Sequence, residues 1–130
     1  MYTITRKVSG YLLTFKGVVD ENEMKKWIED SKRQLSQEKS DSFGVIIDME
    51  NLEPLSPEAA SLMKEGQKLY KEKGMNRSAV ILNSPKICSQ FKNIALQTGI
   101  YTKERYIDAS SVNNPIELAI NWIKDGVSPD

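Results

Sequence analysis

The sequence contains no histidine and only one cysteine, Cys88, among its 130 residues. Without histidine, imidazole-based acid–base catalysis, Ser-His and Cys-His nucleophile pairs and imidazole metal sites are excluded. With a single cysteine, the chain cannot form an internal disulfide or a multi-cysteine zinc site. Carboxylate, lysine and tyrosine side chains remain, but no pair of them has a spacing diagnostic of catalysis. We therefore expect a protein that is not an enzyme.

The chain also lacks an excess of charge and a long apolar run. Its 18 basic and 18 acidic side chains balance, and its composition of 28% charged and 39% apolar residues is ordinary for a globular protein. The first ten residues alternate apolar and polar side chains, unlike a signal peptide. No run approaches the roughly 20 apolar residues that cross a bilayer. We expect a cytoplasmic protein with no membrane span and no nucleic-acid partner.

The glycines lie too far apart to form a dinucleotide-binding loop or a P-loop, so the sequence indicates no cofactor. Asp48 and Glu50 end a predicted strand two residues apart, which would place them on one face and suggests a metal or phosphoacceptor site. A receiver-type site would also need a lysine after the last strand, where the sequence reads Asp-Ala-Ser-Ser. We interpret the two carboxylates as solvated residues at a strand end and expect no metal.

The N-terminal third predicts a hairpin and a helix. Tyr2–Val8 and Tyr11–Val19 are rich in β-branched and aromatic residues and are separated by Ser9-Gly10, a turn signal. Asp20 follows as the N-cap of a helix, with Glu23 three residues later in the position of a capping box.

The remaining chain alternates apolar strands with helices whose first helical residue is proline, a position where the missing N–H costs no hydrogen bond. The strand at residues 43–50 is an almost continuous apolar run, typical of a central strand buried on both faces. The predicted segments are strands Phe43–Glu50, Ser78–Asn83 and Arg105–Ala109, and helices that begin with Ser56, Ser84 and Asn114 as capping residues.

The resulting order, ββαβαβαβα, predicts one α/β domain over residues 1–126, because strands joined through helices run parallel to one another. We expect a mixed, mostly parallel sheet of about five strands with about four helices. Residues 127–130 are predicted to be a frayed tail.

Helical spacing predicts the residues that the helices bury. Trp27 and Trp122 are interpreted as core residues. The helix that begins at Ser84 is predicted to turn one stripe inward, on which a thiol acts as a small hydrophobe whose pKa rises with burial. The residues of that stripe are Ile87, Cys88, Phe91, Ile94 and Ala95.

The segment at residues 43–62 resembles the signature of STAS domains, the anti-sigma-factor antagonist family. An apolar strand ends in Asp-Met, a bend reads ENLEPL, and a helix begins at Ser56. In the family, a strand ending in an Asp-Leu-like pair leads to an Asp-Ser-Ser-Gly turn. The stretch Gly74–Pro85, a short strand near residues 104–109 and a last helix with tryptophan are similar to the stand-alone SpoIIAA-like (STAS-like) bacterial proteins. The resemblance implies this fold over nearly the whole chain.

Signalling members of the family carry a phosphorylatable serine at the start of that helix, where added charge changes which partner binds. In our alignment Ser56 falls on the family's aspartate, Pro57 on the acceptor serine and Glu58 on the second serine, so the acceptor is replaced. A shift of one residue would bring Ser56 into the acceptor position, but Glu53 and Glu58 would then oppose a phosphate. We interpret Ser56 as a helix cap.

The resemblance therefore implies a regulatory module that binds a partner protein through the region Leu52–Leu62 and indicates no particular oligomeric state. The residues expected to take part are Asp48, Glu53, Ser56, Pro57 and Glu58. As an alternative, the resemblance to SpoIIAA-like proteins implies a carrier of a small apolar molecule or lipid, bound in a cleft between the hairpin and the last helices.

Overall fold

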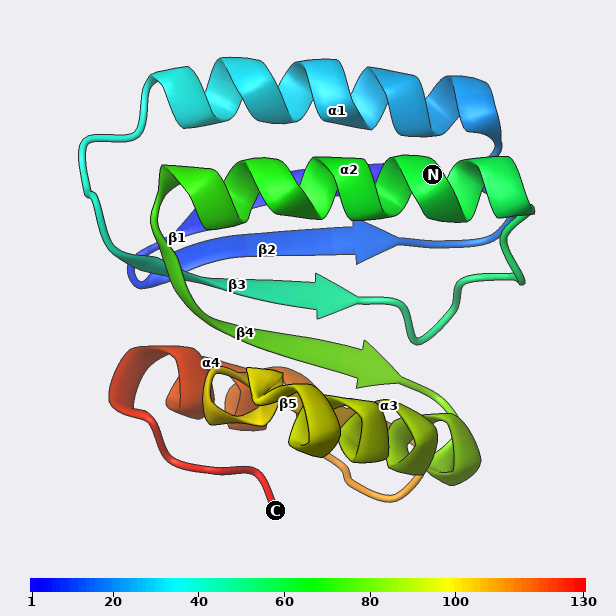
Figure 1. Cartoon of the computed structure of the whole chain (residues 1–130), viewed down its shortest axis with the longest axis vertical. Coiled ribbons are helices and arrows are strands. Elements are labelled where there is room, and N and C mark those ends of the chain that lie inside the picture. The colour runs from blue at the N-terminus through cyan, green and yellow to red at the C-terminus, as the bar shows by residue number, and fades with distance from the viewer.

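Five strands form one sheet in the order in which they occur in the chain (Figure 1). The computed structural model covers residues 1–130. Strand β1 is antiparallel to β2, and the other neighbours are parallel. The third strand is therefore central, and its first five residues are buried, as its apolar sequence predicted. The strands are β1 (Tyr2–Lys7), β2 (Gly10–Phe15), β3 (Phe43–Asp48), β4 (Met75–Leu82) and β5 (Glu104–Asp108).

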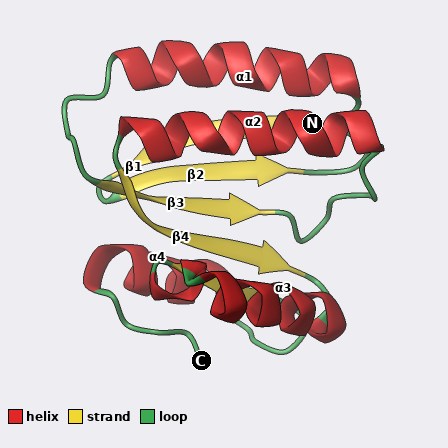
Figure 2. Cartoon of the chain, viewed as in Figure 1, coloured by secondary structure: helices red, strands yellow, loops and turns green.

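Four α-helices cover the two faces of the sheet unequally (Figure 2). From β2 onward, each helical connection leads to the adjacent strand, always toward the β5 edge. Because such connections share one handedness, they place α1, α2 and α3 on the same face of the sheet. The last helix, α4, packs on the opposite face against β3, β4 and β5. The predicted order ββαβαβαβα is confirmed. The helices are α1 (Glu21–Ser36), α2 (Pro57–Lys73), α3 (Pro85–Thr98) and α4 (Pro115–Asp125), with a 3₁₀ turn at Ile100–Thr102.

Three of the four predicted helix caps are present. The side chains of Asp20, Ser56 and Ser84 accept hydrogen bonds from the backbone N–H three residues later, at 2.8, 3.1 and 3.2 Å. Asn114 makes no such bond; its side-chain amide contacts Glu117 at 3.4 Å instead. Its backbone, at φ −133° and ψ 55°, lies outside the extended conformation of the other three caps, so the prediction of a capping side chain there was wrong.

Two hydrophobic clusters form the core, one on each face of the sheet. In the larger cluster, the ring of Tyr11 makes edge contacts with Phe43 and Tyr70 at centroid distances of 5.2 and 5.6 Å. In the smaller cluster, the indole N–H of Trp122 donates to the backbone carbonyl of Ser78 at 2.9 Å. Both tryptophans are buried, as predicted.

The predicted inward stripe of α3 is largely exposed. Ala95 is buried and Cys88 is half-buried, but Ile87, Phe91 and Ile94 are 40%, 37% and 58% exposed. The reason is the position of α3 at the end of its layer. It lies over β5, the last strand of the sheet, so only one side of the helix has strands beneath it.

Helices α1 and α2 approach closely at one glycine. A methyl group at Gly66 would lie 2.1 Å from Cζ3 of Trp27, far inside van der Waals contact. Trp27 is fully buried and stacks on Tyr70 at a centroid distance of 6.3 Å, so its ring has little room to move.

We predict that Gly66→Ala lowers the free energy of unfolding by about 1–3 kcal/mol, because overpacking outweighs the gain in helix propensity of about 1 kcal/mol. Urea denaturation measures the change. In a Trp27→Leu background, Gly66→Ala should lower the free energy of unfolding by less, because the leucine leaves space for the added methyl group. Strictly additive effects of the two substitutions would contradict the steric explanation.

Arg6 and Glu38 join the edge hairpin to the loop after α1. The guanidinium of Arg6 donates to both oxygens of Glu38 at 2.8 and 3.1 Å, and the hydroxyl of Tyr11 and the N–H of Ser40 also donate to this carboxylate. The Glu38 side chain is only 5% exposed. Chiefly through the Arg6 hydrogen bond, the pKa of Glu38 falls from an ordinary 4.5 to about 2.

A carboxyl whose pKa is lowered by folding stabilises the fold above its ordinary pKa, and the contribution is lost as pH falls toward the folded value. Glu38→Gln should therefore lower the free energy of unfolding at pH 7 by about 1.5–3 kcal/mol, the value of hydrogen bonds to a charged group. Between pH 4.5 and pH 2, the stability of the variant should also decline less than that of the wild type. Urea denaturation across this range tests both effects, with exposed Glu29→Gln as the control. Equal acid sensitivity of the Glu38 variant and the wild type would refute the assignment.

Candidate functional site

The segment between β3 and α2, residues 49–56, forms an exposed corner that is fixed to the rest of the fold. Gly17 and Leu52 form a parallel bridge. The N–H of Gly17 donates to the carbonyl of Asn51 at 2.8 Å, and the N–H of Glu53 donates to the carbonyl of Gly17 at 3.0 Å. The corner is thus held in place by the loop that follows β2.

The structure brings four of the five predicted site residues to one surface. Glu53 in the corner and Ser56, Pro57 and Glu58 at the start of α2 are all exposed. Asp48 lies apart from them. It is half-buried at the end of β3, where strand alternation turns its side chain to the face that carries α4.

Asp48 and Glu50, which were expected to share one strand face, do not do so. Glu50 lies beyond the end of β3, in a turn, and its backbone N–H donates to Oδ1 of Asp48 at 3.1 Å. No group of three or more carboxylate or thiol side chains surrounds a common point anywhere in the chain.

Charge of one sign collects at the corner. Residues 43–63 contain no lysine or arginine, and none of their four carboxylates takes part in an ion pair. The segment that forms the corner is therefore negatively charged in a chain with zero net charge. Glu50, Glu53 and Glu58 belong to the corner and the first turn of α2, whereas Asp48 ends β3.

Apolar side chains lie among these carboxylates. Leu52 and Leu55 in the corner and Leu62 on α2 are half-buried and pack against the larger core cluster, with the rest of each side chain open to solvent. Val18 in the adjoining loop is 78% exposed. The surface thus combines rigid apolar patches with negative charge.

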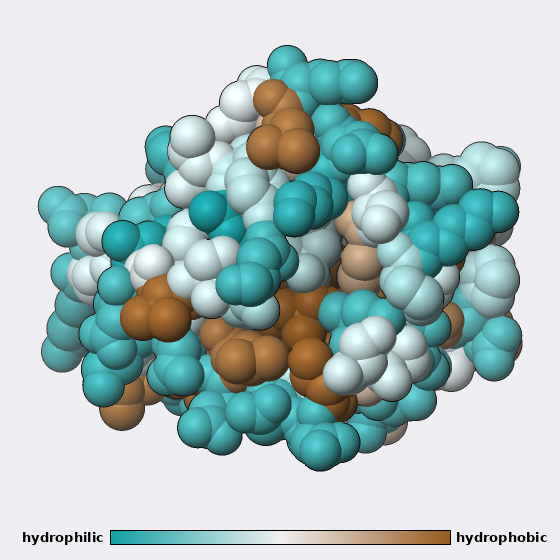
Figure 3. Space-filling model, turned by 90° about the horizontal axis from the view of Figure 1, so that it is seen from below, coloured by the Kyte–Doolittle hydropathy of each residue, from teal (hydrophilic) through white to brown (hydrophobic).

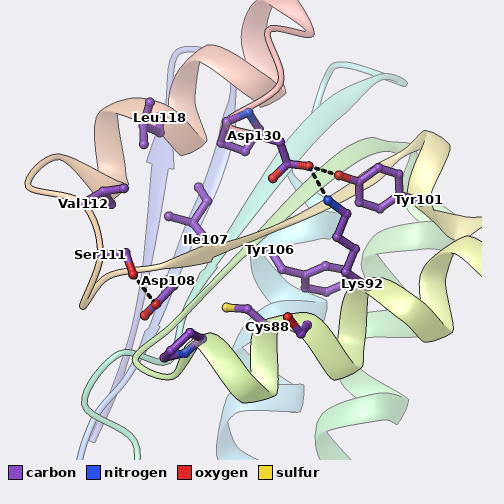
Figure 4. Close-up of a pocket in the computed structure, with 13 residues that line it drawn as sticks. Cys88, Lys92, Tyr101, Tyr106, Ile107, Asp108, Ser111, Val112, Leu118 and Asp130 are labelled. Carbon is purple, nitrogen blue, oxygen red and sulfur yellow. Dashed lines mark hydrogen bonds and ion pairs between the residues drawn. The ribbon is translucent and has the colours of Figure 1, made fainter.

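A hollow lies along the β5 edge of the sheet and was not predicted. Its volume is about 280 Å³, and it opens beside β5 between α3 and α4 (Figure 4). Cys88 and Tyr106 line one side, and Val112 and Leu118 line the other. Segments far apart in the sequence form it. The one feature of the sequence that pointed to this hollow was the number of apolar residues on the helix that begins at Ser84.

At the end of this hollow where β5 finishes, the carboxylate of Asp108 has hydrogen-bond partners. The Asp108 carboxylate accepts hydrogen bonds from the hydroxyls of Ser110 and Ser111, both at 2.6 Å, which lowers its pKa. Burial, aided by the charge of Asp108, raises the pKa of Cys88 to about 11, so its thiol stays protonated at neutral pH. The prediction that burial raises the pKa of this cysteine is confirmed.

No protein-family model matches the chain, and no curated protein resembles it in sequence. Among solved structures, it is similar to an uncharacterized protein of the DUF3478 family from Shewanella loihica, which has a SpoIIAA-like fold. The match has a TM-score of 0.63 and 18% sequence identity, and it covers 95% of this chain and 92% of the other. The chain has a SpoIIAA-like fold.

The predicted SpoIIAA-like fold is therefore confirmed over nearly the whole chain, and the likeness concerns the fold alone. Within this fold, Ser56 caps α2 through its hydroxyl and Pro57 is the first helical residue, as the sequence predicted. None of the helices combines the length and the hydrophobicity needed to traverse a bilayer.

We predict that Ser56→Ala lowers the free energy of unfolding by about 1 kcal/mol, because the N–H of Ala59 loses its partner. Urea denaturation gives the value. Ser61→Ala, at an exposed position inside the same helix, is the control and should change stability little. A Ser56 variant as stable as this control would show that the cap contributes nothing.

Proposed function

We propose that this SpoIIAA-like domain is a non-enzymatic regulatory module that binds a partner protein carrying basic side chains. The proposed binding site is the corner surface, defined as the exposed parts of residues 50–58 together with Leu62. The observation that carries the proposal is the set of unpaired carboxylates around half-buried leucines, in a stretch with no basic residue.

Electrostatics and rigidity both support this choice. A surface of one sign attracts a partner of the opposite sign and excludes partners of like charge, including nucleic acids. The bridge between Gly17 and Leu52 holds the corner in one conformation, so binding would order few groups. The leucines would then supply apolar contact at the centre of a charged rim.

The regulation proposed here does not use a phosphate at Ser56. Its hydroxyl is engaged by the N–H of Ala59, and the carboxylates of Glu53 and Glu58 would repel a phosphoryl group beside them. The domain would act through its permanent negative charge. We place this action in the cytoplasm, where a lone cysteine such as Cys88 stays reduced.

The alternative of a lipid or small-molecule carrier has less support. Where the apolar cleft was expected, between the hairpin and the last helices, Leu12 of β2 packs against the cluster under α4. The hollow beside β5 lies at the opposite edge of the sheet from the hairpin and has charged groups among its lining residues.

A photo-crosslinking amino acid at Glu58 tests the corner surface in cells. We expect one dominant adduct, weakened by Glu53→Lys and by rising ionic strength, because charge attraction contributes to binding. Mass spectrometry identifies the adduct and should show a basic surface on the partner. The matched control places the same amino acid at Lys68, which is exposed in the middle of α2. Equal adducts from both positions, or none from position 58, would overturn the proposal.

A further inference from the structure

Strand β5 is the outer strand of the sheet beside α3, and the middle of its outer edge is unpaired. The N–H of Ser78 donates to the carbonyl of Lys103 at 2.9 Å, and the N–H of Ala109 donates to the carbonyl of Leu82 at 2.8 Å. Odd-numbered residues of β5 therefore turn their backbone groups toward β4. By alternation, the backbone groups of Tyr106 and the N–H of Asp108 point outward.

At the two ends of this edge the outward-facing carbonyl groups already have hydrogen-bond partners. The carbonyl of Glu104 accepts a hydrogen bond from the Arg105 guanidinium at 3.1 Å, and the carbonyl of Asp108 accepts one from the N–H of Ser111 at 3.1 Å. No backbone or side-chain hydrogen bond reaches the N–H or C=O of Tyr106 from outside the sheet. Two donors and one acceptor thus face the hollow in the middle of the strand.

The hollow along this edge, here named the β5 groove, has walls of different chemistry. Helix α3 contributes Cys88 and Lys92, whereas the segment leading into α4 and the helix itself contribute Val112 and Leu118 (Figure 4). Figure 3 looks onto this side of the molecule and shows hydrophobic residues bordered by hydrophilic ones. One wall therefore offers a cation, and the other offers apolar side chains.

The side-chain carboxylate of the chain's own Asp130 lies against the cationic wall of the groove. The side chain of Asp130 lies 3.4 Å from the ammonium of Lys92 and accepts a hydrogen bond from the hydroxyl of Tyr101. The segment that carries it makes no backbone hydrogen bond with β5. The backbone groups of Tyr106 and the N–H of Asp108 therefore have no partner, although Asp130 of the same chain already pairs with Lys92.

We propose that the β5 groove binds an extended peptide as an added strand, with an acidic residue between two apolar residues. The backbone of the peptide pairs with Tyr106 and Asp108. Its acidic side chain replaces Asp130 against Lys92 and Tyr101. Because successive side chains of a strand point to opposite faces, the two flanking residues turn toward Val112 and Leu118.

The groups within the groove set the position of the acidic residue. Asp108, at the carboxyl end of β5, has a lowered pKa, so it is ionised and would repel a second carboxylate there. The thiol of Cys88 is neutral and adds only apolar contact. Lys92 is therefore the one cation among the residues that line the groove, and the peptide residue opposite it is the one that must be acidic.

Titration of the ¹⁵N-labelled protein with a capped Ser-Val-Asp-Val-Ser peptide tests the proposal. We expect saturable shifts of the Tyr106 and Asp108 amides and slower hydrogen exchange of both, because they gain backbone partners. Lys92→Gln should weaken binding about threefold, as expected for a partly exposed ion pair. Asp130→Asn should strengthen it about threefold, because an internal competitor is removed.

The controls separate peptide recognition from simple attraction of charge. Lys86→Gln, on the same helix but outside the groove, should leave the affinity unchanged. A Ser-Val-Asn-Val-Ser peptide should bind about threefold more weakly than the acidic one. The proposal fails if free acetate produces the same amide shifts, if the shifts map to the corner surface, or if Lys92→Gln has no effect.

Discussion

The strict succession of neighbouring strands is the constraint on which the rest of this structure depends. Every helix crossover from β2 to β5 advances to the adjacent strand, so crossovers of one hand must place α1, α2 and α3 on one face. The opposite face is then left for the last helix alone. It covers β3, β4 and β5, and Trp122 and Ile123 close the smaller core beneath it.

Both candidate surfaces lie where this arrangement ends. The corner surface lies at the end of the central strand β3, where the chain turns to begin α2. The β5 groove occurs where the sheet itself stops, with a helix on each face and no further strand. Neither surface interferes with the two cores, which explains how polar and charged groups can collect there at little cost to stability.

Periodicity predicted the helices well, but it misjudged the burial of α3. Ile87, Phe91 and Ile94 follow the same spacing as buried residues on the other helices, yet they are exposed because no strand lies beyond β5. The expectation that Asp48 and Glu50 share one strand face was wrong for a related reason. A spacing of two residues implies a shared face only within a strand, and β3 ends between them.

The sequence by itself determined what depends on neighbours along the chain: the order of the elements, the caps at Asp20, Ser56 and Ser84, the central apolar strand and the acidic stretch after it. These follow from backbone hydrogen bonding and from burial patterns with a period of two or 3.6 residues. Only the tertiary structure decided which edge of the sheet stays open, and which side chains meet there. That outcome depends on contacts between segments far apart in the chain, such as Lys92 with Asp130, and no local pattern encodes such contacts.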